Sequence, residues 1–379
     1  MGFLLALSCT LILYVTLYPF RFDFGLHEGS VLSLFMSTAN NRFSRGDVVA
    51  NVILFLPFGF FAMQRVLPDA TRFIRIIFVI ASGALFAFGI ECAQNYLPGR
   101  VASIYDVAMN TVGVMFGAVL GWKDLRGKFL TSRKLKTGYR QKDIFPLILL
   151  GAWLGVQLVP FVPTLDVQNF NDALKPLFFG SFLPLDALRY FIVTMVVCRL
   201  VGTLTESGRL RMTLMFLPLG VIAIKPFIPG GSISQGKVFG TFLGYAVWWL
   251  ILSRIRRNSG ILAFLLAAQI VIQGLTPFVF NPYRGNFSFI PFVGFLKSTM
   301  FNNVIQFTEK TFLYGALLWL PIKTGLSLRS SLIFCVVLLT GIELAQMFLP
   351  GRVSEISDPL LAVILGIFLY FLDLRDETP

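Results

Sequence analysis

A short polar stretch interrupts an otherwise apolar part of the chain between Gly89 and Asn110. The side chains in this stretch that could bind a ligand or take part in catalysis are Glu91, Gln94, Arg100, Asp106 and Asn110. Because Pro98 and Gly99 follow a helical run, we expect two apolar helices to meet here. Paired carboxylates serve as general acids and bases, and a guanidinium binds phosphate or carboxylate in a bidentate manner. The stretch therefore predicts a binding or catalytic site.

A second polar segment precedes it and adds further candidates. Asp47 and Asn51 are four residues apart, as are Asp106 and Asn110, and this spacing places each pair on one helical face. The candidate binding residues are Arg42, Arg45, Asp47, Asn51, Glu91, Gln94, Arg100, Asp106 and Asn110. Glu91 and Asp106 are the candidates for acid–base catalysis.

Structural roles are the alternative for some of these residues. Ser44 with Asp47, and Ser103 with Asp106, fit a capping box in which the acidic side chain bonds the backbone amide of the cap. Arg100 could also neutralise a nearby carboxylate. We expect that no helix end requires Glu91, and a carboxylate within a membrane indicates function by default.

The composition is that of a polytopic membrane protein. Hydrophobic residues make up 56% of the 379 residues and charged ones 13%, whereas a soluble domain carries about 25% charged residues. The mean hydropathy is +0.77. Apolar runs long enough to cross a bilayer recur about twelve times. We place them near 3–20, 48–67, 73–97, 104–122, 144–162, 184–203, 210–228, 236–253, 260–280, 301–321, 328–349 and 356–372. The fold class expected is an all-α integral membrane protein, with the first run retained as a helix.

The net charge of +13 does not indicate nucleic-acid binding once its distribution is considered. Most Lys and Arg residues fall in alternating loops, such as 123–142 and Arg254–Arg257. The positive-inside rule then places both termini in the cytoplasm. We interpret these charges as orienting the protein and contacting lipid headgroups.

Several classes of site are excluded by residue type. His27 is the sole histidine, which rules out a Ser-His-Asp triad within the membrane and multi-histidine metal centres. The cysteines show no C-x-x-C spacing and fall within or beside apolar runs, and the chain has no nucleotide-binding glycine motif. They are Cys9, Cys92, Cys198 and Cys335. We expect no metal and no cofactor.

Recurring sequence motifs predict three repeats of four helices. Leu17-Tyr-Pro-Phe20 returns as Leu158-Val-Pro-Phe161 and Leu275-Thr-Pro-Phe278, each before a loop on the outer side. The predicted parts are repeat one at 1–125, a basic cytoplasmic connector at 126–139, a degenerate repeat two at 140–257, and repeat three at 258–379 with a short tail. Because four is even, the repeats would be parallel, which favours a pseudo-threefold arrangement. Apolar patches in the outer loops, including Pro176–Phe182 and Phe287–Leu296, are too short to span a bilayer and are expected at the interface.

Repeat three keeps part of the polar constellation. Its candidate secondary site consists of Asn303, Gln306, Glu309, Glu343, Gln346, Arg352 and Asp358. Repeat two has Lys225 where Gln94 would be, and Lys237 where Asp106 would be. The fold thus tolerates loss of the constellation, which favours a functional role for it.

The motifs of repeat one resemble a known family. Asn51-Val-Ile-Leu-Phe-Leu-Pro-Phe-Gly59, followed by Glu91-x-x-Gln94-x-x-x-Pro98-x-Arg100-x-x-Ser103-x-x-Asp106-x-x-x-Asn110, is similar to the VanZ-like domain. Phe289-Ile-Pro-Phe292 resembles a word that the family carries before its second helix. The resemblance implies a multi-pass protein of the bacterial cytoplasmic (inner) membrane, tied to the cell envelope. The family is named for a resistance accessory that lowers sensitivity to teicoplanin-type glycopeptide antibiotics.

Three functions remain open at this point. The first is binding or moving an anionic envelope amphiphile, such as a polyprenyl-linked precursor or a lipoglycopeptide, with membrane lipids as partners and a link to glycopeptide tolerance. The second is an intramembrane enzyme using Glu91 and Asp106, which we favour less because the chain lacks catalytic motifs. The third is a scaffold whose polar side chains only hold helices together.

Overall fold

The structure is a computed structural model that describes residues 2–25, 45–98, 102–122, 144–159, 163–204, 208–255, 257–282, 285–292 and 300–373. The chain divides into two compact units. Unit 1 comprises Met1–Arg133 with Thr299–Phe301, and unit 2 comprises Lys134–Ser298 with Asn302–Pro379. Each unit has its own buried apolar core.

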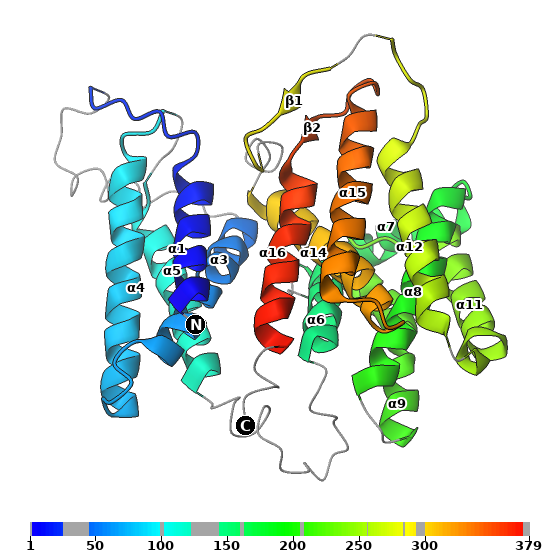
Figure 1. The fold of residues 1–379 in the computed structure, drawn as a ribbon, viewed down its shortest axis with the longest axis horizontal. Helices are drawn as coiled ribbons and strands as arrows, with labels where there is room; N and C mark the ends of the chain where they lie inside the picture. The colour runs from blue at the N-terminus through cyan, green and yellow to red at the C-terminus, as the bar shows by residue number, and fades with distance from the viewer. Residues whose placement is uncertain are drawn as a thin grey trace. The chain divides into compact units, whose positions relative to one another are not determined.

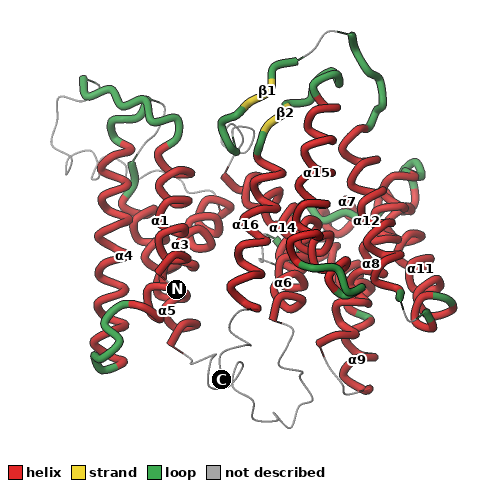
Figure 2. Tube along the Cα trace, in the orientation of Figure 1, coloured by secondary structure: helices red, strands yellow, loops and turns green. Residues whose placement is uncertain are grey.

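Both units are built almost entirely from helices (Figure 1). Unit 1 contains α1 (Gly2–Leu17), α3 (Arg45–Arg65), α4 (Arg72–Gln94) and α5 (Ile104–Trp122). Unit 2 contains α6 (Ile144–Leu158), α7 (Val167–Phe178), α8 (Pro184–Leu204), α9 (Gly208–Met215), α10 (Leu217–Ile224), η2 (Lys225–Phe227), α11 (Gln235–Leu250), η3 (Leu252–Arg254), α12 (Asn258–Leu275), α14 (Met300–Ile322), α15 (Leu328–Gln346) and α16 (Ser357–Asp373). Two short strands, β1 (Phe287–Ser288) and β2 (Ser354–Glu355), complete the described elements (Figure 2).

Helix length and apolarity confirm the predicted fold class. Among the described residues, eight helical stretches are long and apolar enough to cross a membrane. Three shorter apolar helices lie at Leu4–Leu17, Ile144–Leu158 and Ser357–Leu372, and α14 has 23 residues. The chain is thus an all-α polytopic membrane protein. The repeats and their threefold arrangement stay predictions.

One predicted span is not a single helix. The run expected at 210–228 is divided into α9, α10 and η2, with the break at Phe216. Pro218 explains the break, because proline lacks the backbone N–H needed for the helical hydrogen bond and restricts the residue before it.

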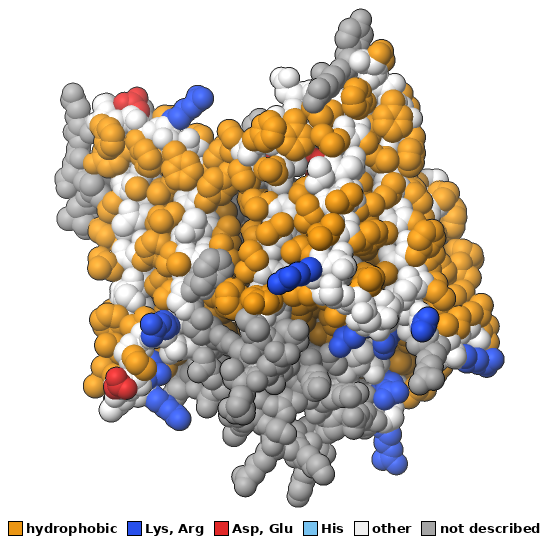
Figure 3. Space-filling model, in the orientation of Figure 1, with side chains coloured by type: hydrophobic (Ala, Val, Ile, Leu, Met, Phe, Trp, Pro, Cys, Tyr) orange, Lys and Arg blue, Asp and Glu red, His pale blue; other side chains and the backbone are white. Residues whose placement is uncertain are grey.

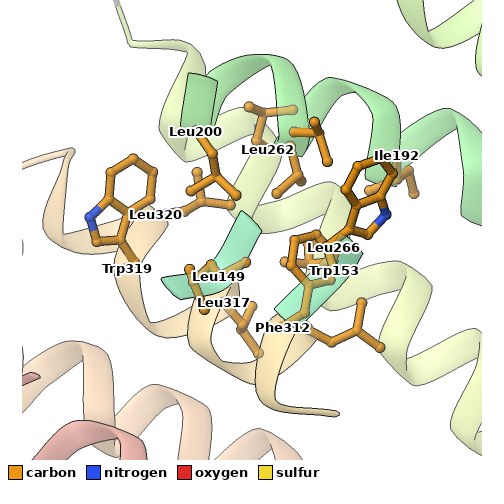
Figure 4. Packing of buried hydrophobic residues seen from close by; sticks show 14 of the residues in the cluster. Leu149, Trp153, Ile192, Leu200, Leu262, Leu266, Phe312, Leu317, Trp319 and Leu320 are labelled. Atoms are coloured by element: carbon orange, nitrogen blue, oxygen red, sulfur yellow. The ribbon is translucent and has the colours of Figure 1, made fainter. Parts of the chain in front are cut away.

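The core of unit 2 is continuous across the boundary that the sequence predicted near residue 258. Figure 4 shows Leu149 and Trp153 from α6, Ile192 from α8, Leu266 from α12 and Phe312 from α14 packed together. All of them are buried. Repeats two and three, if they are repeats, therefore share one core rather than forming separate bodies.

Closely approaching backbones join α3 and α5 in unit 1. A Cβ atom at Gly117 would lie 2.1 Å from the carbonyl oxygen of Leu56, and one at Gly113 would lie 2.4 Å from that of Val52. A side chain at either position would therefore collide with the facing helix. Small residues at four-residue spacing are the usual means of tight helix packing in membranes.

Close packing at glycines also joins α8 and α11 in unit 2. Gly236, Gly240 and Gly244 face α8, and a Cβ atom at Gly240 would lie 2.2 Å from the carbonyl oxygen of Ala187. In both units this close packing fixes the helix whose first turn carries polar site residues.

Large apolar side chains cover much of the helix surface. Phe73 and Phe264 are each 73% exposed, and Leu85 is 72% exposed. On the face drawn in Figure 3, orange side chains cover the helices and the blue Lys and Arg side chains lie mostly toward the lower edge. This distribution is what a lipid-facing surface requires, because apolar side chains are stable against hydrocarbon.

The patch predicted at Phe287–Leu296 begins with a two-residue strand, and it is described as far as Phe292. Residues 287–288 of β1 pair in parallel with 354–355 of β2. The Phe292 backbone N–H donates to Ser357 Oγ at 2.6 Å, and the Phe289 side chain is 76% exposed. The pairing of β1 with β2 therefore fixes the position of Glu355, whose backbone N–H bonds Glu343.

Candidate functional site

The buried carboxylate of Glu91 accepts a hydrogen bond from the start of the next helix. Glu91 lies near the end of α4 and is 2% exposed. Its Oε2 atom accepts from the backbone N–H of Ser103 at 3.0 Å. Ser103 directly precedes α5, where backbone N–H groups lack partners within the helix. Our expectation that no helix end requires Glu91 is wrong, because Glu91 satisfies this N–H.

Asp106 is held by the neighbouring helix. Asn51 of α3 donates from Nδ2 to Asp106 Oδ1 at 2.7 Å. Ser103 Oγ accepts from the backbone N–H of Tyr105 at 3.3 Å, as a helix cap does, while the Ser103 N–H that the predicted capping box assigns to Asp106 donates to Glu91. Asp106 instead ties α5 to α3, and its position in the first turn of α5 is favourable because the helix dipole stabilises negative charge there.

The amide side chains of unit 1 differ in whether they have partners. Gln94 donates from Nε2 to the carbonyl oxygen of Thr16 at 3.0 Å, which ties α4 to the end of α1. Asn110 is 2% exposed and Asn95 is 5% exposed. Within the described residues, neither Asn110 Oδ1 nor Asn95 Nδ2 has a hydrogen-bond partner. Buried polar atoms are almost always bonded, so these two need an explanation.

The arginines predicted for this site cannot be placed with it. Arg42 and Arg100 lie outside the described residues. α3 begins at Arg45, but the side chains of Arg45 and Asp47 are also outside the described part of the structure. Their role in the site stays a prediction.

Unit 2 contains the same carboxylate contact. Glu343 is 3% exposed, and its Oε2 atom accepts from the backbone N–H of Glu355 at 2.8 Å. The two residues are twelve positions apart, which is also the separation of Glu91 and Ser103. Gln346 donates to the carbonyl oxygen of Gly274 at 2.9 Å, so it ties α15 to the end of α12.

Asp358, which corresponds to Asp106 in the predicted repeats, has different partners. Lys310 Nζ lies 2.5 Å from Asp358 Oδ1, and Tyr314 donates from its hydroxyl to Asp358 Oδ2 at 2.5 Å. Both partners come from α14, one helical turn apart. The Asn303 side chain lies outside the described residues.

The remaining members of the predicted secondary site face different neighbours. Glu309 forms an ion pair with Arg189 of α8, with 2.5 Å between Nη2 and Oε1. Arg352 donates from Nη2 to the carbonyl oxygen of Thr276 at 3.0 Å, at the end of α12. Gln306 is exposed. The predicted secondary site is therefore not one cluster: Glu309 pairs with α8 and Arg352 bonds the end of α12, whereas Asp358 bonds α14.

The segment predicted as repeat two carries cations at the corresponding sequence positions. Lys237 Nζ donates to Ser232 Oγ at 2.8 Å and to its carbonyl oxygen at 3.0 Å. Ser234 Oγ lies 3.5 Å from Asp186 Oδ2. Lys225 and Lys237 are both half-buried. What looked like a lost site in the sequence is thus a polar site of opposite charge.

Arg189 and Tyr314 were missed when the sequence was read. Both lie in apolar helical runs and outside the recurring motifs. Arg189 did carry a signal, because an arginine inside an apolar run calls for a buried partner. The partner itself, Glu309, is 120 positions away, which no local pattern reveals.

Metal-ligating groups do not gather in the part of the chain that the structure describes. No set of three or more His, Cys, Asp or Glu residues there is arranged to hold a metal ion. Cys9, Cys92, Cys198 and Cys335 are free thiols.

Comparison with known proteins identifies the first unit. The family model described as VanZ/LLP1 matches residues 5–125. Unit 1 is VanZ-like. The match spans α1, α3, α4 and α5 and so includes the Glu91–Ser103 and Asn51–Asp106 contacts. It confirms the resemblance drawn from these motifs, and the chain is a membrane protein with a VanZ-like unit. No curated protein and no solved structure matches the chain.

Proposed function

We propose that the VanZ-like unit binds the headgroup of an anionic envelope amphiphile. The observation that carries the proposal is the buried Oδ1 atom of Asn110, which has no hydrogen-bond partner among the described residues. Asn110 lies one turn beyond Asp106 on α5, so Asn51, Asp106 and Asn110 form a polar line into the unit. An unsatisfied acceptor costs about 1–3 kcal/mol, and a ligand hydroxyl or amide donor would offset that cost.

The arginines complete the proposed site. Arg42, Arg45 and Arg100 flank the polar residues in the sequence, and guanidinium groups suit phosphate or carboxylate. A polyprenyl-linked precursor or a lipoglycopeptide would combine such an anion with an apolar tail that the surrounding lipid accepts. Under the predicted topology the site opens to the outer half of a bacterial cytoplasmic membrane, and binding there would link the protein to glycopeptide tolerance.

A scaffold is the second candidate, because the structure gives four of the predicted residues bonds between helices. Glu91 bonds the start of α5, Asp106 bonds Asn51, and Gln94 bonds α1. The acid–base alternative is weaker, since both carboxylates already accept hydrogen bonds from N–H groups in these contacts.

Asn110→Leu separates binding from scaffolding. Leucine is nearly isosteric and removes an unpartnered polar atom, so the variant is expected to keep or raise the Tm of the purified protein. Under the proposal, the same variant loses an anionic lipid that native mass spectrometry finds on the wild type, and so does Arg100→Gln. Asn51→Leu is the matched control for structural loss, because it leaves the Asp106 carboxylate without its 2.7 Å bond and lowers the Tm.

Two results would contradict the proposal. One is a wild-type protein that carries no anionic lipid in unit 1. The other is Asn110→Leu protein that keeps the lipid at the wild-type level while its Tm is unchanged or raised, which favours the scaffold.

A further inference from the structure

A polar cavity lies within unit 2. Its volume is about 230 Å³, and its polar lining comes from Asp186 and Arg189 of α8, Gln269 and Gln273 of α12, and Arg352. A single water needs only about 10–15 Å³ of such space. The cavity is therefore large enough for a polar group of several heavy atoms.

Two guanidinium groups reach this cavity with donors to spare. Arg189 bonds Glu309 through Nη2, and Arg352 bonds the carbonyl oxygens of Gln273 and Thr276 through Nη2 as well. A guanidinium has five N–H donors on three nitrogens. Within the described residues these contacts involve one nitrogen of each arginine, so Nε and Nη1 of both are available to a ligand.

Positive charge exceeds negative charge around Arg189. Lys225 interacts electrostatically with Lys237 and with Arg189, and Lys237 interacts with Asp186. Together with Arg352 these residues make four cations, whereas the carboxylates near them are those of Asp186 and Glu309. The net charge of these side chains is positive, so an anion in the cavity would be attracted to them.

Gln269 adds a different requirement. It is 2% exposed, and its Nε2 donates to Gln273 Oε1 at 2.9 Å. Its own Oε1 atom has no partner among the described residues. A ligand that fits the cavity would therefore supply a hydrogen-bond donor beside its anion.

We propose that this cavity is a binding site for a phosphate diester or monoester that carries a neighbouring hydroxyl group. Arg189 and Arg352 bind the phosphate oxygens, and Gln269 accepts the hydroxyl hydrogen. A phospholipid headgroup and a soluble phosphate ester share this chemistry. The site has no residue in common with the one proposed in unit 1, so either can fail without the other.

The test uses the full chain in nanodiscs, with native mass spectrometry to count retained lipids. One set contains phosphatidylcholine alone, a second adds phosphatidylglycerol, and a third adds inorganic phosphate to the second. We expect wild-type protein to retain phosphatidylglycerol selectively. Arg352→Gln weakens that binding about 10- to 100-fold, the effect of losing a hydrogen bond to a charged group.

Two further variants keep the test decisive if Arg352→Gln proves unstable. Arg189→Gln combined with Glu309→Gln removes one guanidinium without leaving Glu309 charged and unpaired, and is expected to weaken binding to the same degree. Lys175→Gln is the charge control: Lys175 pairs with Asp172 at 2.6 Å on the exposed α7, where its hydrogen bond holds the pKa of Asp172 below the usual range. It is expected to retain phosphatidylglycerol.

The lipid source and the hydroxyl contact are tested separately. Displacement of the lipid by inorganic phosphate assigns the site to soluble phosphates, whereas no displacement assigns it to the headgroup. Gln269→Leu is expected to remove the preference for phosphatidylglycerol over phosphatidylmethanol, which has the same charge and no hydroxyl. Equal retention of phosphatidylglycerol by the wild type, by Arg352→Gln and by the double variant would overturn the proposal.

Discussion

Replacement of Glu91 distinguishes a hydrogen-bonding role from a chemical one. Glutamine keeps an oxygen that can accept from the Ser103 N–H, whereas leucine leaves this buried N–H without a partner. The structure places Glu91 Oε2 3.0 Å from that nitrogen and leaves Glu91 2% exposed. The two variants therefore have nearly the same volume and differ in whether residue 91 can accept from the Ser103 N–H.

The expected magnitudes follow from the type of bond lost. Glu91→Gln exchanges a charged acceptor for a neutral one, a difference of about 1 kcal/mol. Glu91→Leu leaves a buried donor unsatisfied, which costs about 1–3 kcal/mol in addition to the lost bond. Because 1 kcal/mol shifts the Tm of a domain of this size by roughly 2–8 °C, the two variants should be well separated.

The assay is thermal unfolding of the purified protein in detergent, with hydrogen exchange at the Ser103 amide as a local readout. We expect the order of Tm to be wild type, Glu91→Gln and Glu91→Leu, with faster exchange at Ser103 only in the leucine variant. Equal Tm values for the glutamine and leucine variants would refute the capping role. Loss of lipid turnover in a fully stable Glu91→Gln protein would instead support the enzyme alternative.

Two further predictions concern packing and the second unit. Gly117→Ala places a methyl group 2.1 Å from the carbonyl oxygen of Leu56 and should lower the free energy of unfolding by about 1–3 kcal/mol. Gly89→Ala is the control, because nothing lies within 4 Å of its new atom, and it should be neutral or stabilising. The Tm of each variant checks both expectations. Tyr314→Phe removes the hydroxyl that donates to Asp358 and should cost about 1.5–3 kcal/mol in the same assay, and an unchanged Tm would show that the contact is not formed.

The sequence predicted the helices well because apolar runs of membrane length have few alternatives. The run expected at 104–122 coincides with α5, and α4 ends at Gln94, shortly before Pro98. The tight packing of α3 on α5 also has a signal in the sequence, because Gly113, Gly117 and Gly121 recur every four residues.

The contacts of the polar residues could not be predicted in the same way. Glu91 binds a backbone amide twelve positions away. Because almost every residue has a backbone N–H, the residue types alone do not show which one Glu91 binds. Arg189 meets Glu309 only because α8 and α14 belong to one core. Sequence spacing shows which residues share a helical face, whereas partners on other helices depend on packing that is known only from the structure.

The central proposal concerns what lies beside Asn110, and a cryo-EM map of the protein in nanodiscs that contain anionic envelope lipid tests it most directly. Binding predicts headgroup density within hydrogen-bonding distance of Asn110 Oδ1, next to the Arg100 side chain. A map with well-defined side chains that shows only water or protein at this position would contradict it.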